Sequence, residues 1–133
     1  VDEYIEEAQS ARVEMPSGGW VMFETTQAMT TIDVNSGSHD APARAVNLEA
    51  AQIIARQIRL RGLGGLIAID FIDMSESADC EPVLQALDEG FTGDKQPIRI
   101  GPISEFGVVE MTRRRGGMTL TQNLQQIGPA TDA

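Results

Sequence analysis

Residues 66–73 are Leu66-Ile67-Ala68-Ile69-Asp70-Phe71-Ile72-Asp73, and this stretch decides the fold. From Leu66 to Ile72 it is nearly all apolar and rich in β-branched side chains, which predicts a central strand covered on both faces. A strand of this kind needs other elements packed against its sheet. We therefore expect a layered α/β domain around it.

The segments before this strand predict a hairpin and a helix. Trp20–Glu24 and Ala28–Asn35 are two short strand-like runs separated by three polar or small residues. Asn47 is the expected N-cap of a helix that ends at Arg61, with Gly62 as its C′ residue.

The remaining elements follow from local spacing. Asp2–Ala11 has helical spacing, Asp79–Glu89 predicts a short acidic helix, and Ile98–Ile100 and Phe106–Thr112 predict the last strands. Residues 116–133 show no periodicity and are expected to form a flexible tail. The fold class is therefore α/β, a mixed β-sheet with a hairpin and flanking helices, within a single domain over residues 1–115.

Composition limits the classes of function. The chain has 133 residues, 41% of them hydrophobic, with 10 Lys+Arg and 20 Asp+Glu for a formal charge of −10. This size suits one globular domain, and no apolar run is long enough to predict a membrane segment. The single cysteine, Cys80, excludes an internal disulfide and a multi-thiolate zinc site, so no zinc is expected. Because Val1 carries no initiator methionine or signal peptide, we expect a piece of a longer protein.

Three polar residues inside apolar strands are the candidate site. Alternation places Ile32 and Val34 on one face of their strand and Asp33 and Asn35 on the other, about 7 Å apart along the strand. Asp70 ends the most apolar strand, and α/β sheets bind ligands at the carboxyl ends of their strands. If the two strands are neighbours, Asp33 and Asp70 can share a cation and Asn35 can add an amide.

Such an all-oxygen set suits Mg²⁺, with Mn²⁺ as a substitute, and it would position a phosphodiester and activate a water. The alternative is structural, because single aspartates are common at strand ends and in turns. Spacing alone leaves both interpretations open for Asp33 and Asp70. Asp73 fits a loop position better than a ligand position.

Most of the basic residues fall into two groups, Arg56/Arg59/Arg61 and Arg113–Arg115, with Arg99 between them. Arg113, Arg114 and Arg115 are candidate RNA-binding residues, although three charges after an edge strand also fit a solvated terminus. The group on the helix also fits ion pairing with the acidic surface. His39 has either a ligand role or a plain loop role. Trp20 and Phe23 should lie on opposite faces of one strand, so they do not form a base-stacking pair.

Several ordered blocks of sequence resemble the ribonuclease E/G family over about residues 12–115. These blocks are Pro16–Gly19, Thr31–Gly37, Asn47–Ala51, Ile54–Arg61, Leu63–Gly65, Ile69–Met74 and Phe106–Arg113. The resemblance implies the deoxyribonuclease I-like catalytic subdomain of a cytoplasmic, Mg²⁺-dependent endoribonuclease that cuts single-stranded RNA in ribosomal RNA maturation and messenger decay. It implies that Asp33 and Asp70 hold the metal and that Asn35 orients the scissile phosphate. The implied partners are RNA, the other domains of the catalytic region and, as one option, further copies in a homo-oligomer.

The chain also departs from the family pattern. Glu105 stands where the family usually has arginine, and residues 75–81 are acidic where relatives are basic. These changes predict that the isolated piece is weak or inactive. They also support an alternative, a divergent non-catalytic member that acts as a protein-interaction or regulatory module.

Overall fold

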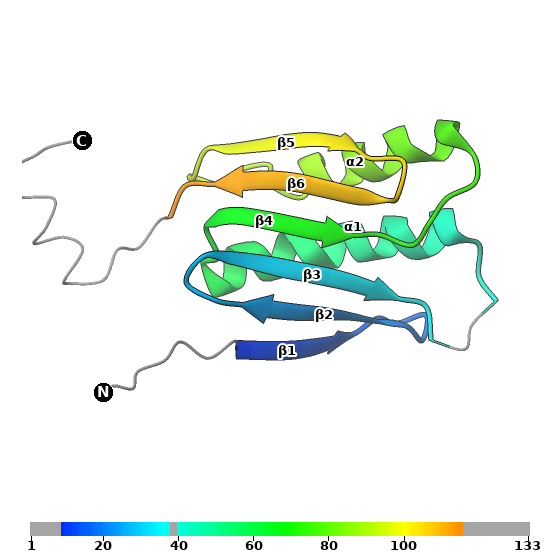
Figure 1. The fold of residues 1–133 in the computed structure, drawn as a ribbon, viewed down its shortest axis with the longest axis horizontal. Helices are drawn as coiled ribbons and strands as arrows, with labels where there is room; N and C mark the ends of the chain where they lie inside the picture. The colour runs from blue at the N-terminus through cyan, green and yellow to red at the C-terminus, as the bar shows by residue number, and fades with distance from the viewer. Residues whose placement is uncertain (1–8, 38–39, 116–133) are drawn as a thin grey trace, which may run out of the picture.

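The computed structural model describes residues 9–37 and 40–115, which form one mixed sheet with two helices behind it (Figure 1). The strands are β1 (Gln9–Glu14), β2 (Trp20–Thr25), β3 (Met29–Asn35), β4 (Gly65–Asp70), β5 (Ile98–Ile103) and β6 (Val108–Arg113). The helices are α1 (Ala43–Arg61) and α2 (Cys80–Glu89), the latter preceded by a 3-10 turn at Ser77–Asp79. The α/β class, the mixed sheet, the hairpin and the flanking helices are confirmed.

The strand order is β1-β2-β3-β4-β6-β5, so β1 and β5 form the edges. Within the described residues, β3 and β4 pair parallel and the other neighbouring strands pair antiparallel. α1 is the crossover that joins β3 to β4, as expected for a parallel pair. The carboxyl ends of β3 and β4 therefore lie at the same edge of the sheet, on the right in Figure 1.

The core lies between the sheet and the two helices. In β3 the buried side chains are Thr30, Ile32 and Val34, and they alternate with exposed ones. α1 contributes a stripe that includes small residues such as Ala51 and Ala55, which let the helix approach closely. The largest fully buried side chains are Phe23, Ile32, Ile54, Ile58, Ile67, Ile69, Leu87, Met111, Val21, Val83, Val109 and Asn47.

The prediction that both faces of the β4 strand are covered is wrong. Both helices lie on the same side of the sheet (Figure 1), and Leu66 on the other face is 42% exposed. Ile67 and Ile69 are fully buried, whereas Ala68 is half-buried and Asp70 is exposed. An apolar run shows that a strand is central to a sheet but not that its second face is filled.

The start of α1 also differs from the prediction. The helix begins at Ala43, with Pro42 at the capping position, so Asn47 is not its N-cap. Asn47 is fully buried in the second turn, where its amide makes a tertiary contact described below. The end is confirmed, because Gly62 adopts the left-handed conformation at φ 65° and closes the helix.

At the N-terminal side, residues 9–11 belong to β1, so the expected helix through Ala11 is wrong there. Ala11 and Val13 are half-buried and alternate with exposed Arg12 and Glu14, which is the strand period. The rest of that expected helix, His39 and the expected tail at 116–133 lie outside the described residues. No helix in the described segments is both long enough and apolar enough to cross a membrane.

Candidate functional site

Asp33 and Asp70 are direct partners on the parallel strands β3 and β4. Both side chains are exposed on the face that the helices leave open. Neighbouring strands are about 4.8 Å apart, so in-register side chains on one face lie next to each other. β4 ends at Asp70, while β3 continues for two more residues to Asn35. The structure thus brings the three predicted residues to one sheet edge.

The carboxylates repel each other. The pKa of Asp33 is raised above its usual value, first by partial desolvation against the surrounding sheet and then by the negative charges of Asp70 and Glu24. Glu24 lies on β2, on the same open face. A carboxyl whose charged form is disfavoured by neighbouring carboxylates is stabilised by a bound cation. The donor set therefore fits a hard divalent metal that takes one or two carboxylates and leaves its other positions to water or phosphate.

The side chain of Asn35 is oriented by its own turn. Its Oδ1 accepts a hydrogen bond from the backbone N–H of Gly37 at 2.8 Å. The side chain is exposed, and its Nδ2 group, a double donor, makes no hydrogen bond among the described residues. The backbone of Asn35 is packed against Gly19, where an added Cβ would lie 2.2 Å from the Asn35 carbonyl oxygen. Only glycine fits there, which explains Gly19 in the sequence.

Asn47 is a positioning residue that the sequence analysis missed. Its Nδ2 donates to the carbonyl of Ile72 at 2.8 Å, and its Oδ1 accepts from the N–H of Ile72 at 3.0 Å. The preceding residue, Phe71, donates its N–H to the carbonyl of Gly107 at 3.0 Å. These bonds fix the backbone directly after Asp70. The sequence offered no distinct signal for this role, because an asparagine at the start of a helical pattern equally fits an N-cap.

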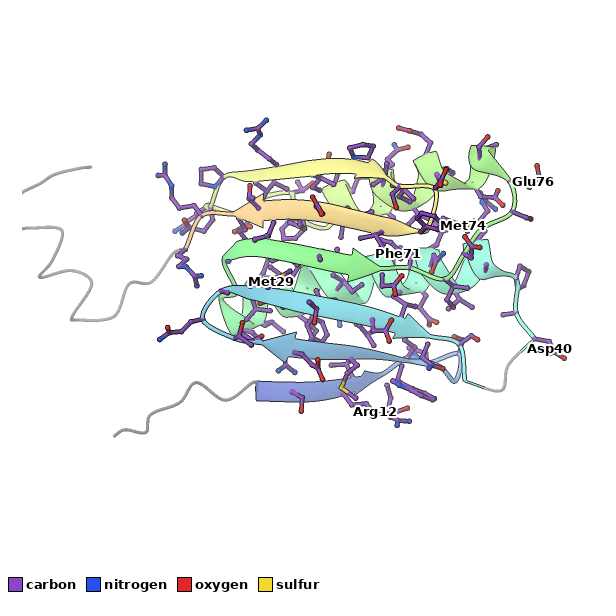
Figure 2. All side chains as sticks on the ribbon, viewed as in Figure 1. Arg12, Met29, Asp40, Phe71, Met74 and Glu76 are labelled. Atoms are coloured by element: carbon purple, nitrogen blue, oxygen red, sulfur yellow. The ribbon has the colours of Figure 1, made fainter. Side chains whose placement is uncertain are left out.

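Acidic residues surround this edge. Figure 2 shows the segment after β4, marked by Phe71, Met74 and Glu76, leaving the sheet at the end where Asp40 also lies. Asp73 is exposed on this segment, in a loop as expected. Glu105 lies in the β5–β6 turn, whose Gly107 bonds to Phe71. The edge that carries the candidate metal ligands is therefore strongly acidic.

The three consecutive arginines do not lie at this edge. Gly65 pairs with Arg113 and Asp70 pairs with Val108, so Arg113 is at the opposite end of β4. That end is about 17 Å away at 3.4 Å per residue. β6 is an inner strand, which corrects the expected edge strand, and Arg113 is only 6% exposed. Arg114 and Arg115 are exposed and follow it.

Other candidates have structural surroundings. Phe23 is buried while Trp20 is half-buried on the other face, with the Arg12 guanidinium 3.8 Å from its ring centroid, so the two aromatics are separated as predicted. Cys80 is a free, half-buried thiol. Among the described residues, no group of three or more His, Cys, Asp or Glu side chains is placed to hold a metal. The Asp33–Asp70 edge offers two carboxylates and an amide.

The fold and this edge define an α/β protein with paired carboxylates at the carboxyl ends of two parallel strands. A model of the Ribonuclease E/G family matches residues 1–116. The chain belongs to this family.

The chain is similar to proteins named ribonuclease E and ribonuclease G. The chain is 44% identical to ribonuclease E of Synechocystis sp. over 97% of its own length and 20% of that protein. It is 41% identical to ribonuclease E of Nostoc sp. over 98% of the chain and 20% of the relative. It is 42% identical to ribonuclease E of Escherichia coli over 97% of the chain and 13% of that protein. The chain therefore spans a fifth or less of these curated relatives.

Proposed function

We propose that this chain is the metal-binding catalytic subdomain of a Mg²⁺-dependent endoribonuclease that hydrolyses phosphodiester bonds of single-stranded RNA. The observation that carries the proposal is the in-register pair of Asp33 and Asp70, exposed on adjacent parallel strands. Family membership supports the reaction class. For the whole protein we propose a cytoplasmic activity in ribosomal RNA maturation and messenger decay, with this chain as the deoxyribonuclease I-like subdomain of the catalytic region.

Asp33 and Asp70 would hold the cation, and their carboxylate oxygens are the ligands that Mg²⁺ prefers. When bound, the metal would supply a water of lowered pKa and polarise the phosphate. Two carboxylates alone bind Mg²⁺ weakly, so substrate phosphate oxygens are expected to complete the site.

Asn35 would orient the scissile phosphate. Because Gly37 occupies its Oδ1, its Nδ2 is the group left to donate to a non-bridging phosphate oxygen. Asn47 and Gly107 would contribute indirectly, because their hydrogen bonds hold the backbone that follows Asp70. Positioning of this kind is a large part of phosphoryl-transfer catalysis.

A second function keeps the fold without the reaction: a divergent member that binds or regulates another protein. Glu105 and the exposed acids Asp73 and Glu76 at the site edge favour it, because they oppose the approach of RNA. Retention of both Asp33 and Asp70, in register, favours the enzyme. The remaining domains of the catalytic region and other copies of the chain are the proposed partners of the enzyme.

Mn²⁺ titration of the metal-free chain tests the site directly. Paramagnetic Mn²⁺ should broaden the amide resonances of Asp33, Asp70 and their sheet neighbours first, and the Asp70→Asn variant should lose this selectivity. Glu110→Gln is the matched control, because it removes one carboxylate from the same open face, at a position that pairs with Ala68 on the neighbouring strand β4. Broadening that is the same in wild type and Asp70→Asn would contradict the proposed metal site.

A further inference from the structure

A second polar region lies at the other end of the molecule, on the helix-bearing side. Residues of α1, the segment after α2 and the end of β6 enclose a hollow of about 660 Å³. Its charged lining is Arg56, Arg59, Lys95 and Arg113 around a single acid, Asp94, and we call it the basic groove. The chain as a whole carries a charge of −10, so this concentration of cations is exceptional for the molecule.

The acid in the basic groove is already neutralised. Arg113 donates two hydrogen bonds to the carboxylate of Asp94, from Nε at 2.9 Å and from Nη2 at 3.0 Å. The pair is nearly inaccessible, with side-chain exposures of 6% and 7%, and Arg113 Nη1 also donates to the carbonyl of Leu63 at 2.8 Å. These contacts lower the pKa of Asp94, so its charge persists and stays paired. The floor of the groove is therefore a buried ion pair whose two charges compensate each other.

Arg56, Arg59 and Lys95 form the walls and are exposed. None of them is within ion-pair distance of a carboxylate in the described parts of the chain. Arg59 Nη1 donates to the carbonyls of Gly90 at 3.2 Å and Thr92 at 3.4 Å, which holds its guanidinium in place while leaving other N–H donors unused. Within residues 9–37 and 40–115, the three cations thus face one hollow without an ion-paired carboxylate, although the charge of Arg59 also helps to lower the pKa of Asp94.

A helix-terminus effect does not account for this arrangement. Arg59 is in the last turn of α1, where the helix dipole favours a cation. Lys95, however, follows α2 and precedes β5, so it gains nothing from the end of α1. The side-chain amides of Gln52 and Gln96 also line the hollow and add neutral donors. Cations and amides that converge on one hollow are the donor set of an anion site.

We infer that the basic groove binds backbone phosphates of a single-stranded polynucleotide, an inference that rests on the proposed function for its ligand class. Two guanidinium groups favour phosphate, which they contact through two parallel hydrogen bonds. The groove holds a part of the strand that does not react. Asn47 is bonded to the segment that follows Asp70, and Arg59 lies in the groove. The two residues are about 18 Å apart along α1 at 1.5 Å per residue.

Charge reversal at the groove tests the inference. The binding of a labelled, unstructured single-stranded RNA is followed by fluorescence anisotropy at low salt without divalent metal. Arg56→Glu and Lys95→Glu should each weaken binding about threefold or more. The slope of log K against log salt should become shallower by about 0.7 for each phosphate that the variant no longer neutralises. Arg99→Glu, which changes the net charge equally from an exposed position in β5 outside the groove, should have a smaller effect on both.

The neutral variants Arg56→Gln and Lys95→Gln, checked by thermal unfolding, repeat the test with a smaller perturbation of the fold. Equal losses in groove variants and in Arg99→Glu overturn the inference. A polyglutamate peptide that binds as well as RNA, with the same dependence on Arg56 and Lys95, overturns the polynucleotide assignment. RNA binding that is unchanged in Asp70→Asn but weakened in Lys95→Glu supports it. Failure of Mn²⁺ to bind Asp33 and Asp70 would count against the proposed function only, since the groove assay contains no metal.

Discussion

The side chain of Asn47 is hydrogen-bonded to both backbone polar groups of Ile72, through Nδ2 at 2.8 Å and Oδ1 at 3.0 Å. Asn47 is fully buried in α1, and Ile72 lies two residues after Asp70. One amide therefore joins the helix layer to the backbone that continues from the candidate metal ligand. The position of Asp70 depends on a residue on the other side of the sheet.

Replacing Asn47 by Ala should destabilise the fold by about 2–4 kcal/mol, because it leaves the N–H and the carbonyl of Ile72 without partners. Asn47→Asp keeps the size but cannot donate to the Ile72 carbonyl, so it should also be destabilising. The control is Gln52→Ala, an exposed position on the same helix. Urea unfolding measures the difference in stability. Equal midpoints for the Asn47 and Gln52 variants would show that the Asn47–Ile72 hydrogen bonds contribute nothing to the stability of the fold.

The sequence predicted the order and type of most elements because their periodicity is local. β3 shows strict alternation, and α1 ends at Gly62 with the expected left-handed residue. The open face of β4 could not be read from its apolar run, because the side on which helices pack depends on the whole connection pattern. Asn47 was assigned to a cap because asparagine is common there, whereas its tertiary partner lies 25 residues away.

For the candidate site, alternation placed Asp33 and Asn35 on one face, and the strand-end rule placed Asp70 at an edge. That β3 and β4 are parallel neighbours in this register is tertiary information. The burial of Arg113 was likewise invisible, because its partner Asp94 is far along the chain and three adjacent arginines look alike in sequence. The catalytic roles themselves stay predictions.

Removing one charge from the carboxylate pair should stabilise the metal-free chain. Asp33→Asn removes the desolvation cost of this carboxylate and its repulsion with in-register Asp70, a gain of roughly 0.2–1 kcal/mol, the size of other cross-strand charge effects. The direction of the Asp33 pKa shift also sets how the stability of the fold depends on pH. Because folding raises the pKa of Asp33, its ionisation opposes folding as pH rises through that pKa.

The gain in Asp33→Asn should therefore be present at neutral pH and vanish at acid pH, where wild-type Asp33 is protonated. Thermal unfolding with and without Mn²⁺ measures it, and Mn²⁺ should stabilise wild type more than the variant. Glu110→Gln, which has no carboxylate opposite it on β4, should show no comparable gain. A variant less stable than wild type at neutral pH would mean that the charge of Asp33 does not oppose folding.

The Arg113–Asp94 pair makes a separate prediction about stability. Arg113→Met should cost about 3–5 kcal/mol, because it leaves a buried carboxylate without its partner. The double variant Arg113→Met/Asp94→Leu should recover much of this loss, since removing both charges of a buried pair is often nearly neutral. Urea unfolding of the two variants beside wild type provides the comparison, and additive losses would contradict coupling.

The same pair should act in acid denaturation. Arg113 lowers the pKa of Asp94 below its unfolded value, so the stability it provides is complete above the unfolded pKa and is lost as pH falls through the folded one. Wild type should therefore lose more unfolding free energy on acidification below about pH 4 than the double variant, given the ordinary pKa of aspartate. If the unfolding free energies of wild type and the double variant fell in parallel with pH, Asp94 would have no part in acid denaturation.

The last prediction is that this chain alone cleaves single-stranded RNA very slowly or not at all. Binding of RNA depends on basic side chains that neutralise phosphates. The Asp33–Asp70 edge instead carries two further acids, Asp73 and Glu105. The arginines at 113–115 lie at the opposite end of β4, and the basic groove offers only a few contacts.

Catalysis also requires a phosphate held in line with the attacking water, which contributes roughly 7–11 kcal/mol when complete. The relatives are at least four times longer than the part matched here, and we expect their other parts to share that positioning. The assay uses a fluorescent single-stranded RNA with Mg²⁺ at low salt, beside Asp70→Asn as the metal-ligand control. Glu105→Arg should raise the rate by strengthening RNA binding at the edge. Rapid cleavage by the wild-type chain that disappears in Asp70→Asn would show that the two carboxylates and their sheet are sufficient, and the prediction would be wrong.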